Sequence, residues 1–116
     1  MGLDMMAYAV DPTVKQDKGV NIAEWRKHPN LHGWMEQLWR ERTDSREDFN
    51  CQEVELTLKD LKALEVAVMM GQLPETTGFF YGTSSDSYYK STDLAFIDES
   101  RALLKKGKKV FYNSWW

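Results

Sequence analysis

The ten residues WRKHPNLHGW, from Trp25 to Trp34, hold two tryptophans, two histidines, an arginine and a lysine. Arginine and tryptophan side chains together allow planar stacking and bidentate contacts to an anion. The alternative interpretation is a helix whose basic side is simply in water, as most runs of charge are. We predict ligand contacts from Trp25, Arg26, His28 and His32, and we expect Trp25, Arg26 and His32 to converge.

The segment TTGFFYG, residues 76–82, is the second candidate part of a binding site. Its two glycines are typical of a tight strand end, and they also let the backbone approach a ligand closely. A phosphate-binding P-loop needs a lysine and a helix start after the glycines, and both are absent here. The predicted ligand contacts in this segment are Thr76, Thr77, Gly78 and Phe79.

Metal and nucleophilic chemistry have weaker support in the sequence. His28 and His32 have HxxxH spacing, with Glu36 one turn further on, but zinc needs three or four ligands and Pro29 interrupts the pair. Cys51 is the single cysteine, and a lone cysteine is more often a small buried hydrophobe. We therefore predict no metal and no cofactor, and a hydrolase using His28 or His32 is the least supported function.

The composition limits the class of protein and its partners. The chain has 116 residues, 15 basic and 18 acidic, with a formal net charge of -3. Proteins that bind duplex nucleic acid usually have a basic field, which is missing overall. No apolar run of about 20 residues and no secretory signal pattern is visible. We expect one domain over residues 1–116, cytoplasmic, without a membrane or duplex nucleic acid partner.

The first two elements depend on alternation and on one proline. Residues 2–10 alternate with apolar side chains on both faces, which predicts a central strand. An apolar stripe over residues 31–39 predicts a helix. This helix begins either near His28 or near Asn21 with a kink at Pro29, and the second start is favoured because it adds Trp25 to the buried side.

The remaining elements complete a β-α-β-α-β-α-β order. They are a strand at 49–56, a helix with the capping box Thr57–Asp60 that ends at Gly71, a strand at 76–82, a helix capped by Ser91 or Thr92 that ends at Gly107, and a strand at 108–116. This alternation also allows a parallel doubly wound sheet, but the strands are short. We predict an α+β fold: a single-domain two-layer sandwich, with a mixed four-stranded sheet and about three helices on one face.

Four motifs together resemble a family of small proteins found in tailed bacteriophages and in bacteria. They are GLDMMAY, EWRKHPNLHGWM, LPETTGFFYG and YNSWW. The resemblance implies a virus-encoded or mobile accessory protein that acts inside a bacterial cell. Some members carry a phosphoglycerate kinase label, which a chain of this length without a nucleotide-phosphate loop does not support.

Besides the hydrolase, two functions are compared. The first is binding of a small anionic, nucleotide-like ligand without turnover, which would sequester a host signal. The alternative is a protein-interaction module that inhibits or redirects a host enzyme through exposed aromatic residues, notably Trp115 and Trp116. Adjacent residues of a strand face opposite layers, so only one of these tryptophans can pack under the helices. The other is a candidate subunit contact, which predicts a homodimer.

Overall fold

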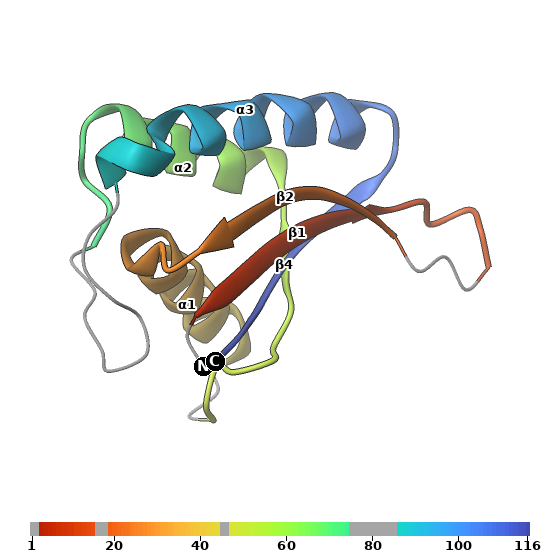
Figure 1. Cartoon of the computed structure of the whole chain (residues 1–116). Helices are drawn as coiled ribbons and strands as arrows, with labels where there is room; N and C mark the ends of the chain where they lie inside the picture. Colours follow the sequence, from red (N-terminus) through yellow and green to blue (C-terminus); the bar gives the residue numbers. More distant parts are fainter. Residues whose placement is uncertain (1–2, 16–18, 45–46, 75–85) are drawn as a thin grey trace.

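Strands and helices follow one another in the order ββαβααβ (Figure 1). The computed structural model describes residues 3–15, 19–44, 47–74 and 86–116. The strands are β1 (Asp4–Val10), β2 (Val20–Arg26), β3 (Val54–Leu56) and β4 (Lys109–Trp115), and the helices are α1 (Pro29–Thr43), α2 (Leu58–Met69) and α3 (Asp86–Lys105). The strand expected at 76–82 lies wholly outside the described residues. None of the described helices has the length and apolar character needed to cross a membrane.

The four described strands form one sheet in the order β2-β1-β4-β3, and every neighbouring pair is antiparallel. The first and last strands pair along their whole length, from Asp4 opposite Trp115 to Val10 opposite Lys109. The α+β class with four strands and three helices is confirmed. The expected mixed sheet was wrong, because all described neighbouring strands are antiparallel. Parallel neighbours need a crossover of about a dozen residues or more, whereas only residues 11–19 separate β1 from β2 in the sequence.

The first helix begins at Pro29, so the favoured start near Asn21 was wrong. Proline suits the first helical turn because its missing N–H has no helical partner there, and it disfavours a helical residue before it. Lys27, with φ of 54°, separates the helix from β2. The residues upstream are extended instead and pair with β1, which places Trp25 opposite Met5.

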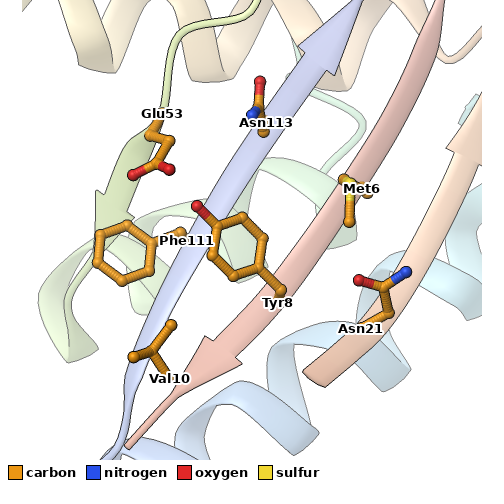
Figure 2. A pocket seen from close by; sticks show the side chains of 7 residues that line it. All are labelled: Met6, Tyr8, Val10, Asn21, Glu53, Phe111 and Asn113. Carbon is orange, nitrogen blue, oxygen red and sulfur yellow. The ribbon is translucent and has the colours of Figure 1, made fainter. Parts of the chain in front are cut away.

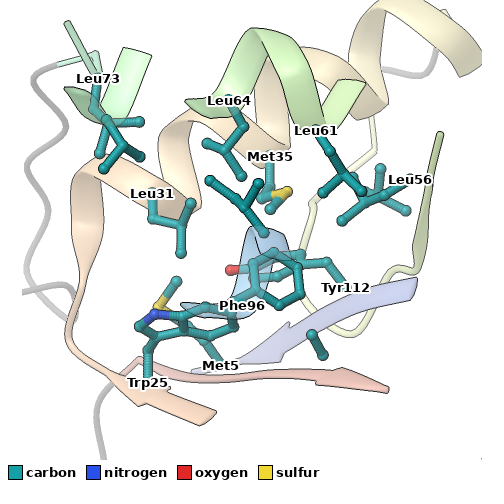
Figure 3. Close-up of a cluster of buried hydrophobic side chains, with 14 of the residues drawn as sticks. Met5, Trp25, Leu31, Met35, Leu56, Leu61, Leu64, Leu73, Phe96 and Tyr112 are labelled. Carbon is teal, nitrogen blue, oxygen red and sulfur yellow. The ribbon is translucent and has the colours of Figure 1, made fainter. Parts of the chain in front are cut away.

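All three helices cover the same face of the sheet, as expected. Side chains from every helix join the inward side chains of the strands in one hydrophobic core. Figure 3 shows Trp25 of β2, Phe96 of α3 and Tyr112 of β4 meeting below the leucines of α1 and α2. Among the described residues, the largest fully buried side chains are Tyr112, Phe49, Phe96, Leu3, Met5, Leu31, Met35, Leu56, Leu61, Leu64, Ile97 and His28. Each large apolar member contributes about 1.5–3 kcal/mol of burial.

Local signals fixed both ends of α2. The Thr57 hydroxyl accepts from the Asp60 backbone N–H at 3.2 Å, and the Asp60 carboxylate accepts from the Thr57 backbone N–H at 2.9 Å. Gly71, with φ of 65°, follows the helix in a left-handed conformation that glycine adopts without strain. The predicted capping box and the glycine stop are therefore confirmed.

Two other boundaries differ from expectation. The helix α3 begins at Asp86, so the cap expected at Ser91 or Thr92 was wrong, and both residues lie inside the helix. The strand expected at 49–56 is shortened to Val54–Leu56. Cys51 has φ of 63°, which a β-strand does not allow.

The two C-terminal tryptophans divide between the faces of the sheet, as expected. The Trp116 ring packs against the core and meets the His32 ring edge to face at 4.9 Å. Trp115, opposite Asp4, is 43% exposed on the face away from the helices. A subunit contact through Trp115 stays a prediction.

Candidate functional site

Trp25, His28 and Asp93 form a buried hydrogen-bond network. The Asp93 carboxylate accepts from Trp25 Nε1 at 2.8 Å and from His28 Nε2 at 2.9 Å. The side chains of His28 and Asp93 are 0% and 1% exposed. The His28 ring also stacks on Tyr89, with 4.9 Å between the ring centroids. Trp25 and His28, two of the predicted ligand residues, therefore use their polar atoms to link β2 and the start of α1 to Asp93 in α3.

His32 is buried among aromatic rings. Its Nδ1 lies 2.8 Å from the Tyr112 hydroxyl, and the Phe49 ring centroid lies 5.2 Å from the imidazole. Burial lowers the pKa of His32 to about 4, because the interior disfavours the imidazolium form. At neutral pH this residue offers no positive charge to an anion.

Arg26 lies apart from the other predicted residues of the first segment. Successive strand residues point to opposite faces, so Arg26 projects away from Trp25. Its side chain is 76% exposed, and its Nε lies 3.7 Å from the Asp4 carboxylate. The expected convergence of Trp25, Arg26 and His32 was therefore wrong. Thr76, Thr77, Gly78 and Phe79 lie outside the described residues, and their ligand contacts stay predictions.

Metal ligation gains no support from the part of the chain that the structure describes. In that part, no three His, Cys, Asp or Glu side chains gather in a way that could hold an ion. His28 and His32 have different partners, Asp93 and Tyr112. Cys51, the other soft ligand considered, is exposed before β3.

The sheet face away from the helices carries a run of apolar side chains. We call this run the apolar row, and it consists of Met6, Tyr8, Val10, Phe111 and Trp115. Tyr8 and Phe111 are directly opposite in register, and their rings stack with centroids 5.5 Å apart and an interplanar angle of 20°. The outer face of an antiparallel sheet is normally polar, so an apolar row there marks a candidate binding surface.

A hollow of about 440 Å³ lies in the middle of the apolar row (Figure 2). We call it the central hollow. The Tyr8 hydroxyl reaches across β4 and donates a hydrogen bond to the Glu53 carboxylate. Burial and this hydrogen bond raise the pKa of Tyr8, so the phenol stays neutral. The lining residues are Met6, Tyr8, Val10, Asn21, Glu53, Phe111 and Asn113.

A second hollow, of about 360 Å³, lies at the end of the sheet where Arg26 projects. We call it the end hollow, and Met6 lines both hollows. The Tyr89 hydroxyl fixes the backbone there, because it donates to the Arg26 carbonyl at 2.9 Å and accepts from the Arg26 N–H at 3.0 Å. The lining residues are Asp4, Met5, Met6, Glu24, Trp25, Arg26, Tyr89 and Trp115.

Acidic side chains outnumber basic ones on the described part of this face. The basic residues are Arg26 and Lys109, opposite Asp4 and Val10. The acidic residues are Asp4, Glu24, Glu53 and Glu55, in or beside the strands. Such a surface attracts basic partners and repels anions.

The predicted site residues did not include the apolar row. The alternation of residues 2–10 does place Met6, Tyr8 and Val10 on one face, opposite Met5 and Ala7. An apolar strand with two apolar faces suggests burial on both sides, and only the structure shows that the helices cover one. The stacking of Tyr8 on Phe111 joins the two ends of the chain, which no local sequence signal reveals.

The chain matches no protein-family model, no curated protein and no solved structure. The geometry of the described residues therefore carries the functional conclusion.

Proposed function

We propose that this protein is an interaction module whose uncovered sheet face binds a segment of a partner protein bearing basic and apolar side chains. The observation that carries the proposal is the apolar row, with Tyr8 stacked on Phe111 and Trp115 43% exposed. Aromatic and methionine side chains are enriched at the centres of protein interfaces, with polar residues around them. The apolar row, with acidic side chains around it, has this arrangement.

The charge of the face selects the chemistry of the partner. Glu53 and Glu55 lie on the β3 side of the apolar row, and Asp4 and Glu24 lie toward its β2 end. Complementary charge speeds association and rejects partners of the wrong sign. A second copy of this chain would bring acidic side chains against acidic side chains, so a different, basic protein is the better occupant.

The resemblance to phage and bacterial proteins gives this partner a biological class. An accessory protein of that kind would act on a protein of the bacterial host, inhibiting or redirecting it. The exposed aromatic surface is what such an inhibitor needs, because a few buried aromatic anchors carry most of the affinity of an interface.

Binding of a small anionic, nucleotide-like ligand is the second candidate function. Arg26 favours it, because its exposed side chain carries a positive charge and both Arg26 and Trp115 line the end hollow. Asp4 and Glu24 line the same hollow and oppose an anion. A thermal-shift panel of nucleotides tests it: stabilisation that Arg26→Ala abolishes would favour this function over protein binding.

A selection from a library of random peptides tests the interaction module directly. The immobilised wild-type protein is the bait, and the Phe111→Ala variant serves for counter-selection. We expect enriched peptides to combine Arg or Lys with apolar residues, and to bind more weakly at high salt because the face is acidic.

Val66→Ala is the matched control, because Val66 is 51% exposed on α2, on the helical side of the molecule. The selected peptides should bind this variant as they bind wild type. Enrichment of acidic peptides, equal binding to Phe111→Ala, or no enrichment at all would each overturn the proposed function. Dimers of the free protein that Trp115→Ala dissociates would instead make a second copy the occupant.

A further inference from the structure

The central hollow combines two flat rings with a carboxylate at its edge. The Tyr8 and Phe111 rings are nearly parallel, with centroids 5.5 Å apart and an interplanar angle of 20°, so each offers a flat face to the hollow that both line. In Figure 2 the Glu53 carboxylate is directed toward the Tyr8 hydroxyl. A carboxylate has about four lone-pair sites. The hydrogen bond from Tyr8 uses one of them, so Glu53 retains acceptors for a ligand.

Two amides complete the polar lining of the central hollow. Asn21 Nδ2 donates to Glu24 Oε1 at 3.3 Å, and the Asn21 side-chain oxygen points toward Tyr8 (Figure 2). Asn113 Oδ1 accepts from the Ser114 backbone N–H at 2.7 Å, which fixes the orientation of this amide. Neither lysine nor arginine is among the residues that line the hollow. The hollow thus offers aromatic faces and the oxygens of Glu53 and Asn21 as acceptors, and no lining residue is a cation.

We propose that the central hollow binds the guanidinium group of an arginine on the partner, with its plane over the Phe111 ring and its N–H groups donating to Glu53. Guanidinium is planar, stacks on aromatic faces and matches a carboxylate with two parallel hydrogen bonds. Lysine has a compact ammonium that cannot stack in this way. This assignment rests on the proposed interaction function and names the side chain that the face recognises.

The test uses N-acetylarginine amide as the probe, with N-acetylcitrulline amide as a neutral control of the same shape. Amide chemical shifts of the full chain are followed by NMR during millimolar titrations. We expect the arginine probe to shift the signals of Tyr8, Glu53 and Phe111. Citrulline should bind about tenfold more weakly, because it lacks the charge that Glu53 and the rings attract.

Two variants with the same change of charge separate the site from the general acidity of the protein. Glu53→Gln keeps an oxygen that accepts from Tyr8, so the hollow keeps its shape, and we expect about tenfold weaker binding of the arginine probe. Glu99→Gln changes an exposed carboxylate on α3 and should leave binding unchanged. Equal shifts from citrulline or from a lysine probe, or unchanged binding by Glu53→Gln, would overturn the assignment.

The outcomes also separate this assignment from the function on which it rests. Selected basic peptides that bind the apolar row while the arginine probe does not would refute the guanidinium subsite alone. A failed peptide selection would refute the interaction module, whatever the small probe does.

Discussion

Replacing Asp93 with alanine should destabilise the fold more than any other single change of a charged residue in α3. The Asp93 carboxylate accepts from Trp25 Nε1 at 2.8 Å and from His28 Nε2 at 2.9 Å, and it is 1% exposed. Each buried donor left without a partner costs about 1–3 kcal/mol. Two such donors give about 2–6 kcal/mol, a large part of the stability of about 5–15 kcal/mol typical of a small domain.

Urea unfolding followed by tryptophan fluorescence and far-UV circular dichroism measures this loss. Asp98→Ala is the matched control, because Asp98 lies on the same helix with a side chain 77% exposed, and it should change stability by less than about 0.5 kcal/mol. Asp93→Asn should fall between the two, because an amide oxygen still accepts from Trp25. Equal losses for Asp93→Ala and Asp98→Ala would refute the role given to the buried network.

Three further predictions follow from burial. The pKa of His32 is lowered to about 4 in the folded protein, so the unfolded chain binds a proton there more readily. The free energy of unfolding should therefore fall by about 2 kcal/mol from pH 7 to pH 5. In urea titrations a His32→Gln variant should lose this dependence of stability on pH. Trp34→Ala should lower the stability by about 3 kcal/mol, because Trp34 packs against the core. Arg26→Ala should lower it by under about 1 kcal/mol, because Arg26 is exposed; thermal unfolding measures both losses. Trp116→Ala should lower the melting temperature by several degrees and Trp115→Ala hardly at all; the reverse order would contradict the assignment of faces.

Elements with strong local signals were predictable from the sequence. The Thr57–Asp60 capping box and Gly71 bound α2, alternation marked β1, and β-branched and aromatic residues marked β4. These signals are set by backbone groups within a few residues. The α+β class followed from them without any knowledge of long-range contacts.

The start of α1 shows what the local pattern could not decide. Trp25 fits the apolar stripe of a helix extended backward from Pro29, and it also fits a strand that packs inward. Pairing with β1 and the hydrogen bond to Asp93, 68 residues away in sequence, favour the strand. Both are tertiary interactions, which override weak local preference.

The candidate site depended even more on such contacts. The cluster of Trp25, His28 and His32 suggested a binding site because polar rings are costly in a core. The structure instead pairs these rings with Asp93 and Tyr112, which lie far along the chain. Burial is acceptable for polar groups once they are hydrogen-bonded, and the sequence does not reveal those partners.

Chemical-shift mapping of a selected basic peptide on the isotopically labelled protein tests the central claim most directly. The bound peptide should shift the amide signals of Met6, Tyr8, Phe111 and Trp115, and leave those of α2 unchanged. The main competing surface is a hollow of about 280 Å³ between α1 and α2 that Trp34 lines. Shifts confined to Trp34 and α2, with the apolar row unaffected, would contradict the assignment of the uncovered sheet face as the binding surface.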